Sequence, residues 1–178
     1  MDSRIPAENS LLQFLLSGKR FLIITGEVNS GKTSTVEKII SDLRAVQKNV
    51  GGVYSKGIFS ENEKTGFIAV DIKSGEAKQL ASIQSDNNFN LNQGRFYFNP
   101  EIFREYNTKI LNSLNSDVII IDEVGKLELD EKGFSPSVQY LINDFAGKII
   151  LVVRKSLADK VFNKFHLKPE YADTFELK

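Results

Sequence analysis

The segment "GEVNSGKT" at residues 26–33 constrains the possible folds more than any other part of the chain. It fits the pattern G-x-x-x-x-G-K-[ST], which binds phosphate groups when it connects a buried strand to a helix. Both flanking elements are expected here, because "FLIIT" (21–25) is an apolar run of strand length and apolar residues recur at helical spacing over 32–47. The order of strand, glycine loop and helix therefore predicts an α/β fold with a phosphate site at this loop.

The residue types of the loop suit a bound nucleotide. Its glycines let successive backbone N–H groups point inward at an anion, and the following helix adds the positive end of its dipole. Lys32 can reach the β and γ phosphates as a point charge, and the Thr33 hydroxyl can bind a Mg²⁺ ion that bridges them. We therefore predict a nucleotide phosphate site rather than a glycine-rich turn that binds nothing. Its expected residues are Gly26, Glu27, Val28, Asn29, Ser30, Gly31, Lys32, Thr33 and Ser34.

Strand-like apolar runs alternate with helical segments over most of the chain. A helix capped by Asn99 is expected before "VIIID" (118–122), and a helix that begins at Ser135 is expected before "IILVV" (149–153). Apolar strands that alternate with helices indicate a parallel sheet covered on both faces. Because no linker or repeat divides the chain, we predict a three-layer sandwich with a mainly parallel sheet, in one domain spanning 1–178.

The region between the first two predicted helices has a different pattern. Short strand-like runs within 50–83 are separated by "ENEKT" and "KSGE", which are typical of turns. We predict a small antiparallel meander there, set against or inserted beside the main sheet. The stretch 84–99 is polar and rich in Asn and Gln before it becomes aromatic in "RFYF", and we expect a long, ordered surface loop.

The composition gives no sign of a nucleic-acid partner or of export. Lys plus Arg and Asp plus Glu both number 23, so the formal charge is zero and no basic stripe is evident. The chain has no cysteine, which excludes disulfides and thiolate metal sites. The apolar cluster "LLQFLL" (11–16) is too short for a signal sequence or a membrane span. We therefore expect a cytoplasmic protein that binds neither nucleic acid nor a membrane.

A second functional segment, "VIIIDEVGKLEL" (118–129), ends a buried strand in two adjacent acids. A nucleotide at a phosphate loop needs an acid on its metal side, normally at the end of a neighbouring apolar strand, and Asp122 has that position. Side chains alternate along a strand, so Asp122 would share a face with Ile120, and Glu123 would share the other face with Ile121. We predict that Asp122 binds Mg²⁺ and that Glu123 orients or deprotonates an attacking water.

Several segments together resemble those of a known family, the P-loop nucleoside-triphosphatases sometimes described as nucleotide kinase-related. The most specific of them is the Asp-Glu-x-Gly-x-x-Glu-Leu portion of the second functional segment. The similarity spans about residues 21 to 154. The segments that carry it are "GEVNSGKT" (26–33), "GGVY" (51–54), "TGFIAVDI" (65–72), "GRFYFNPEIF" (94–103) and "IIIDEVGKLEL" (119–129).

This resemblance implies an enzyme with the P-loop NTPase fold that hydrolyses nucleoside triphosphates to diphosphates and phosphate. It implies Mg²⁺ as the cofactor and loose base selectivity, with ATP or GTP as the expected substrate. Lys32, Thr33, Asp122 and Glu123 carry over position by position. Glu128 and Leu129 carry over as well, with no chemistry assigned to either, and Glu128 could brace the loop.

Other residues have a functional and a structural interpretation. Arg154 follows the strand 149–153 at its carboxyl end and is a candidate arginine finger or a surface residue. Arg95 is a candidate nucleotide contact, whereas of the aromatic residues 96–98 at least two are expected to pack in the core. Gly125 could present its N–H to the γ phosphate or permit a turn. The lone His166 is expected to be a surface residue near a helix end.

Three other functions are compatible with a phosphate loop. A signalling GTPase is disfavoured, because the string nearest to the Asn-Lys-x-Asp motif, "NKFH" (163–166), lacks the aspartate. A nucleotide or small-molecule kinase would transfer the γ phosphate to an acceptor, but the six arginines are scattered rather than gathered in a lid. A nucleotide-dependent binding switch with slow turnover could use the stretch 84–99 as its partner loop. Hydrolysis is the leading prediction, and phosphoryl transfer is the alternative.

Overall fold

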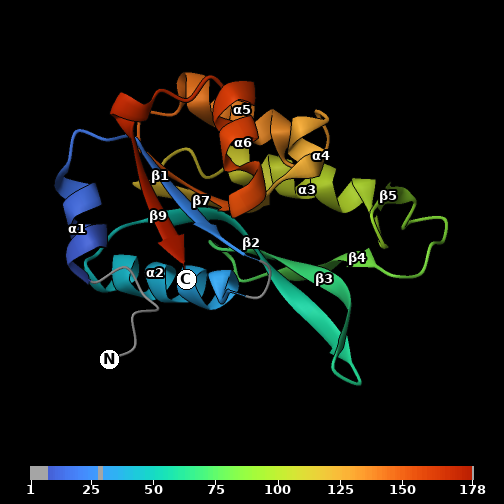
Figure 1. The fold of residues 1–178 in the computed structure, drawn as a ribbon. Helices are drawn as coiled ribbons and strands as arrows, with labels where there is room; N and C mark the ends of the chain where they lie inside the picture. The colour runs from blue at the N-terminus through green and yellow to red at the C-terminus, as the bar shows by residue number, and fades with distance from the viewer. Residues whose placement is uncertain (1–7, 28–29, 178) are drawn as a thin grey trace.

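A computed structural model describes residues 8–27 and 30–177. Its centre is a nine-stranded sheet with the order β5-β6-β4-β3-β2-β7-β8-β1-β9 (Figure 1). The strands are β1 (Phe21–Gly26), β2 (Val50–Ser60), β3 (Glu63–Asp71), β4 (Ala77–Ser82), β5 (Leu91–Gln93), β6 (Phe96–Phe98), β7 (Val118–Val124), β8 (Lys148–Arg154) and β9 (Ala172–Leu177).

The strands β2, β7, β8, β1 and β9 form a parallel half of this sheet. Every residue of β1 is buried, and β7 and β8 are buried over most of their length. Their apolar side chains point to both faces, as expected for parallel strands covered on both sides. The predicted parallel sheet is therefore confirmed.

Helices cover both faces of the sheet. In Figure 1, α2 (Lys32–Ala45) lies below the sheet and four other helices lie above it. The helix α1 (Glu8–Leu16), at the left of the picture, packs in the same core as α2. Two apolar cores match this division, since Val118 and Ile120 of β7 pack with α2 while Ile119 and Ile121 pack on the opposite side. The predicted three-layer α/β sandwich is thus confirmed. The remaining helices are α3 (Pro100–Leu111), α4 (Lys126–Leu129), α5 (Ser135–Asp144) and α6 (Ala158–Lys164), with short 3₁₀ turns at Lys155–Leu157 and Pro169–Tyr171.

The start of α3 follows from its sequence. The Asn99 side chain accepts hydrogen bonds from the backbone N–H groups of Glu101 and Ile102, and Pro100 occupies the first helical position, where no N–H is required. The predicted Asn99 cap is therefore confirmed. The helix α4 was not expected, because the sequence after β7 shows only four residues of helical pattern.

The predicted meander is present, but it continues the main sheet instead of lying beside it. The strand β2 pairs in parallel with β7 over Val50–Val53 and in antiparallel fashion with β3 from Val53 onward. The strand β4 then pairs with β3. Figure 1 shows the far end of the β2–β3 hairpin extending away from the helices. One long strand therefore belongs to both halves of the sheet.

The predicted loop 84–99 is partly wrong. Its second half forms the antiparallel hairpin of β5 and β6, and β6 joins the sheet through β4. Phe96 and Phe98 are half-buried and pack against the core, which outweighs the polar composition of the preceding stretch. Gly94, with a φ of 63°, makes the tight turn between the two strands. The prediction that at least two of these aromatic residues pack in the core is confirmed.

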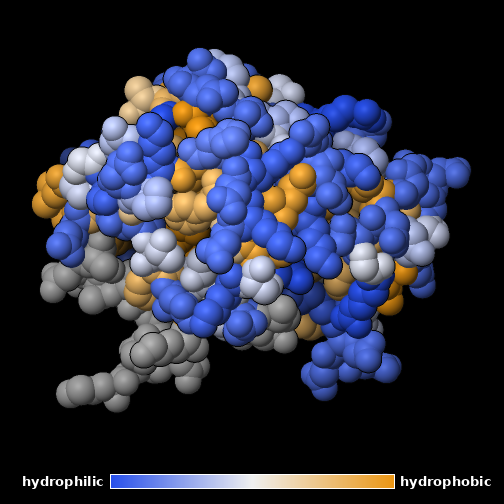
Figure 2. Space-filling view, turned by 45° about the horizontal axis from the view of Figure 1, so that its top comes forward, coloured by the Kyte–Doolittle hydropathy of each residue, from blue (hydrophilic) through white to orange (hydrophobic). Residues whose placement is uncertain are grey.

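The surface and the helices add two observations. On the face shown in Figure 2, hydrophilic residues separate the hydrophobic ones into small patches, as is ordinary for a folded domain. Among the helices of the described residues, none has the length and apolar character needed to cross a membrane.

Candidate active site

The glycine loop lies where the sequence predicts it, between β1 and α2. Gly26 ends β1, and a side chain there would bring its Cβ atom to 2.4 Å from the Ser30 hydroxyl. Gly31 has a φ of 82° immediately before the first residue of α2, a left-handed conformation that glycine adopts without strain. Two loop residues predicted to bind the nucleotide, Val28 and Asn29, lie outside the described residues.

Lys32 occupies the centre of this loop. Its ammonium group donates a hydrogen bond to the Gly26 carbonyl at 3.1 Å and another to the Glu27 carbonyl. The residue is buried, and this burial lowers the pKa of Lys32, whereas the carboxylates of Glu123 and Asp122 act in the opposite direction. The ammonium charge is therefore held at the end of the sheet where both acids lie.

The two predicted metal ligands are joined through the backbone of one residue, Ser55 of β2. The Thr33 hydroxyl donates to the Ser55 carbonyl at 3.2 Å, and the Ser55 N–H donates to the Asp122 carboxylate at 3.1 Å. A residue of α2 and a residue of β7 are thus brought to the same point. The sequence did not single out Ser55, because a backbone contact of this kind has no residue-type signal.

Asp122 is almost completely buried, with 1% of its surface exposed. Burial raises the pKa of Asp122 above its usual range, and the neighbouring Glu123 adds to this effect, while hydrogen bonds from the N–H groups of Ser55 and Glu123 oppose it. A carboxylate in such surroundings is stabilised by a cation, and a hydroxyl with a carboxylate is an oxygen donor pair of the kind Mg²⁺ prefers. Thr33 and Asp122 therefore suit Mg²⁺.

Glu123 leaves the regular path of β7. Its φ of 61° is unusual for a residue other than glycine, and the pairing with β8 shifts at this point, since Ile121 lies opposite Leu151 and Val124 opposite Val153. One residue of β7 is therefore extra, as in a β-bulge. Val124 joins the same core as Ile121.

The bulge interrupts the regular pairing of β7 at the two acids. The predicted division between the faces nevertheless agrees with the structure, because Glu123 lines a cavity together with side chains of the core that contains Ile121. Asp122 instead accepts a hydrogen bond from Ser55, whose carbonyl accepts one from Thr33 of α2. The two carboxylates are therefore not equivalent. Asp122 is buried, while about a third of the Glu123 side chain is exposed at the end of the strand.

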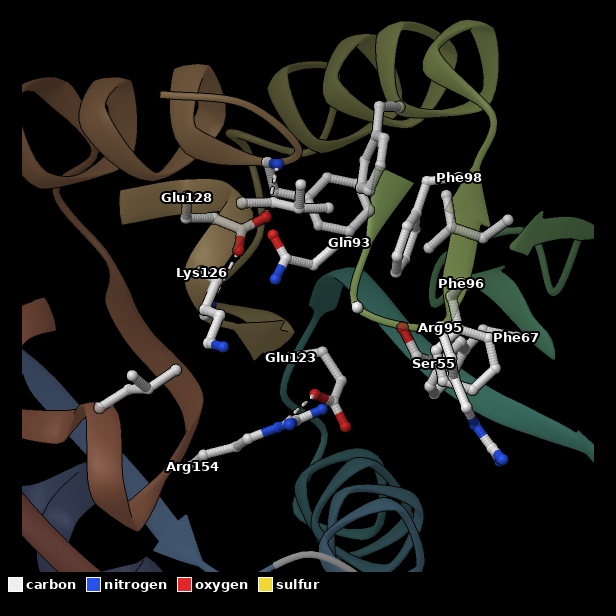
Figure 3. Close-up of a pocket in the computed structure, with 17 residues that line it drawn as sticks. Ser55, Phe67, Gln93, Arg95, Phe96, Phe98, Glu123, Lys126, Glu128 and Arg154 are labelled. Atoms are coloured by element: carbon white, nitrogen blue, oxygen red, sulfur yellow. Dashed lines mark hydrogen bonds and ion pairs between the residues drawn. The ribbon is translucent and has the colours of Figure 1, made fainter. Parts of the chain in front are cut away.

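Arg154 lies next to Glu123. It ends β8, the strand beside β7, and its Nε atom is 3.8 Å from the Glu123 carboxylate. Figure 3 shows the two side chains pointing toward each other at one end of a cavity. The predicted position of Arg154 at the carboxyl edge of the sheet is confirmed, since this edge also carries Lys32 and Asp122.

Glu128 supports the loop after the bulge. It is buried, and its carboxylate accepts hydrogen bonds from the backbone N–H groups of Gly125 at 2.8 Å and Phe134 at 2.9 Å. Burial raises the pKa of Glu128 to about 7. The bracing role expected for Glu128 agrees with these contacts. They also direct the Gly125 N–H to Glu128, which favours the turn over a contact with the γ phosphate, the two alternatives for this residue.

Two other candidates lie away from the phosphate loop. The guanidinium group of Arg95 donates to the Lys64 carbonyl at 2.7 Å and lies 5.1 Å from the centre of the Phe96 ring. His166 is exposed just after α6, as expected for a surface residue.

Comparisons with known proteins agree with this geometry. A model of the family described as NTPase matches residues 21–177. The nucleoside-triphosphatase THEP1 of Methanothermobacter thermautotrophicus is 30% identical over 138 residues, which cover 76% of this chain and 78% of that protein. The protein of the same name from Thermotoga petrophila is 30% identical over 137 residues, which cover 76% and 72%.

A solved structure has the same fold. The solution structure of a human cancer-related nucleoside triphosphatase superposes with a TM-score of 0.67, at 20% identity and with 89% of each chain covered. This similarity concerns the fold. Together with the family match over residues 21–177, the phosphate loop and the paired acids, it leads to one assignment: the chain belongs to the NTPase family of P-loop proteins.

Proposed function

We propose that this protein hydrolyses nucleoside triphosphates to diphosphates and phosphate at the edge of the sheet formed by the ends of β1, β7 and β8. The observation that carries the proposal is the connection of Thr33 and Asp122 through Ser55, beside the ammonium group of Lys32. A phosphate loop, a hydroxyl and an acid gathered at one edge of the sheet are the elements that a Mg²⁺-bound triphosphate requires. The naming of relatives as nucleoside-triphosphatases supports the same reaction.

Different residues of the site bind the phosphates, neutralise their charge and hold the metal ion. The N-terminus of α2 and the loop before it present backbone N–H groups to the β and γ phosphates. Lys32 neutralises charge on the γ phosphate, because its ammonium group already lies inside the loop. Thr33 and Asp122 would hold Mg²⁺, which when bound neutralises phosphate charge that develops in the reaction.

Glu123 is the residue that we assign to the attacking water. Its carboxylate lies at the end of β7, beyond Asp122, and is partly exposed, so a water molecule can reach it. From there it orients the water and takes its proton. Arg154, at 3.8 Å from this carboxylate, is placed to stabilise negative charge on the transferred phosphoryl group. Loose base selectivity and a cytoplasmic location stay predictions from the sequence.

Phosphate release from purified protein tests this proposal. ATP, GTP, CTP and UTP are compared with and without Mg²⁺, and we expect Mg²⁺-dependent release from several of them. Lys32→Ala should lower the rate by on the order of 10²-fold or more, because it removes a charge that acts on the transferred group. Lys38→Ala on the same helix, where the lysine pairs with Asp42, is the control and should keep the rate. Equal rates for both variants would refute the role of Lys32.

A further inference from the structure

A cavity of about 290 Å³ lies beyond Glu123. The carboxyl ends of β7 and β8, the β5–β6 hairpin, α4 and the start of α3 contribute to its walls. Figure 3 shows Glu123 and Arg154 at one end of this space and Phe96 and Phe98 at another side. Of the described residues of the phosphate loop, none lines the cavity. It is therefore a compartment that adjoins the phosphate site and is distinct from it.

The cavity is much larger than hydrolysis requires. One water molecule occupies about 30 Å³ in the liquid. Sites for small organic molecules range from about 300 to 1,000 Å³, so this cavity has the size of a compact ligand. The volume next to Glu123, the carboxylate proposed to activate the water, thus suits a molecule of one or two rings.

Phenylalanine rings form most of the apolar wall of the cavity. The Phe67 and Phe96 rings meet edge to face at 4.9 Å between centroids, and the Phe98 and Phe103 rings stack at 5.7 Å. Phe134 continues the series with an edge-to-face contact to Phe103 at 4.9 Å. Aromatic rings pack favourably on such surfaces, whereas a strongly charged ligand would lose its hydration there. The wall therefore favours a flat, apolar or heteroaromatic body.

Apart from Arg95, which lies over the Phe96 ring, the charged side chains of the cavity are at the other end. Glu123 and Arg154 face the cavity there, and Figure 3 shows the side-chain amide of Gln93 and the Lys126 ammonium group nearby. A ligand that fits both ends has an aromatic body and a polar group directed at Glu123. This division, a mostly apolar pocket with a few polar groups that fix orientation, is typical of sites for small molecules.

Glu123 lies between the phosphate site and the cavity, so its position determines what the polar group of a bound ligand would contact. Lys32, Thr33 and Asp122 gather on one side of it, where the γ phosphate is proposed to lie, and the aromatic cavity is on the other. In phosphoryl transfer the attacking oxygen approaches opposite the leaving oxygen. A hydroxyl group held at the polar end of the cavity would therefore occupy the place of the attacking water.

We propose that this cavity binds a compact aromatic or heteroaromatic alcohol, and that the enzyme transfers the γ-phosphoryl group to its hydroxyl. The alcohol oxygen forms a bond to the γ phosphorus, and the bond from that phosphorus to the β–γ bridging oxygen breaks. The nucleoside diphosphate leaves with the electron pair of the broken bond, and Glu123 takes the hydroxyl proton. The products are a phosphate monoester and the diphosphate. This inference rests on the proposed function, because it uses the same phosphate site and the same carboxylate.

Phosphorus NMR tests the transfer directly. The protein is incubated with ATP and Mg²⁺, alone and with benzyl alcohol, 3-pyridinemethanol or thymidine at millimolar concentration. We expect a phosphate monoester from at least one of the three alcohols, formed at the expense of inorganic phosphate. Phosphate release with no monoester from any alcohol would overturn the acceptor site and leave the proposed function intact. No phosphate release without alcohol would instead overturn the proposed function.

A matched pair of variants tests whether the alcohol binds in the cavity. Gln93→Trp fills the space from β5, whereas Asn92→Trp puts the same side chain at the adjacent, exposed position, which does not line it. We expect the ratio of monoester to inorganic phosphate to fall at least tenfold in Gln93→Trp and to stay at the wild-type value in Asn92→Trp. The chain has no other tryptophan, so fluorescence of each variant checks that it folds. An equal ratio in both variants would overturn the location.

A competition measurement distinguishes an alcohol in this cavity from the base of the nucleotide, which could occupy the same space. The rate of phosphate release is measured against ATP concentration at several concentrations of the best alcohol. If the alcohol binds beside the γ phosphate, it leaves the KM for ATP nearly unchanged while the monoester appears. An increase of the KM in proportion to the alcohol concentration would assign the cavity to the base and overturn the proposal.

Discussion

The carboxylate of Glu128 accepts a hydrogen bond from the backbone N–H of Gly125 at 2.8 Å, two residues after Glu123. Its other oxygen accepts from the Phe134 N–H at 2.9 Å. One buried side chain thus fastens the segment after the bulge to the start of α5. The position of the proposed catalytic carboxylate depends on this contact, because Glu123 itself has an unfavourable backbone conformation that surrounding structure must hold in place.

Glu128→Ala should therefore destabilise the protein and lower its rate of phosphate release. The substitution leaves the buried N–H of Phe134 and the partly buried N–H of Gly125 without an acceptor, and a buried group left unpaired costs about 1–3 kcal/mol. We expect the free energy of unfolding in urea to fall by about 2 kcal/mol or more, together with a fall in the rate of phosphate release. Glu170→Ala, at an exposed position, is the control. Wild-type stability in Glu128→Ala would show that these contacts do not hold the loop.

The raised pKa of Glu128 predicts a pH dependence of stability. Its carboxyl has an ordinary pKa of 4.5 in the unfolded chain and about 7 in the folded protein, so the folded state binds the proton more tightly. Stability then falls as pH rises through this range. Between pH 4.5 and 7, the unfolding free energy of wild type minus that of Glu128→Gln should decrease by up to about 3 kcal/mol. If urea titrations give the same difference at both ends of this pH range, the pKa of Glu128 is not raised by folding.

Asp122→Asn should change the response to Mg²⁺. The amide keeps one oxygen for the Ser55 N–H but loses the negative charge that the metal requires. We expect the Mg²⁺ concentration for half-maximal phosphate release to rise by about tenfold or more, in line with the loss seen when metal-site groups are altered. Asp144→Asn, at the exposed end of α5, should behave as wild type. The same Mg²⁺ titration curve for both variants would exclude Asp122 as a ligand.

Patterns local to a few residues could be predicted from the sequence. The glycine loop, the apolar strands and the acids after β7 each depend on neighbours in the chain, and the structure has them where expected. Contacts between distant segments could not be predicted. The role of Ser55 depends on the register between β2 and β7, and the bulge at Glu123 becomes visible only through the pairing of β7 with β8.

The β5–β6 hairpin shows a different limit. Its sequence is polar enough to be taken for a loop, yet both Phe96 and Phe98 pack against Phe67 of β3, which is distant in the chain. Strand formation there depends on these tertiary contacts more than on local propensity. The cavity, which the hairpin closes on one side, could not be predicted from the sequence for the same reason.

Arg154→Ala should separate activity from stability. The Arg154–Glu123 ion pair is long, at 3.8 Å, and about half of the arginine side chain is exposed, so it contributes little to stability. Its contribution to the charge of the transferred group is expected to be larger, and the turnover number should fall by on the order of 10³-fold. The urea midpoint should stay close to that of wild type and of the surface control Arg104→Ala. An unchanged turnover number would remove Arg154 from the mechanism.

Glu123→Gln gives the sharpest test of the assigned water-positioning group, because the chain contains a matched control. Glu131 has the same φ of 61° at an exposed position, so Glu131→Gln makes the same chemical change at a residue with the same φ. We expect Glu123→Gln to bind nucleoside triphosphate with wild-type affinity in calorimetry. Its turnover number should fall by roughly 10²- to 10⁴-fold, which is the contribution typical of a general base. Glu131→Gln should keep both properties. If the two variants turn over ATP equally fast, the attacking water is activated by another group.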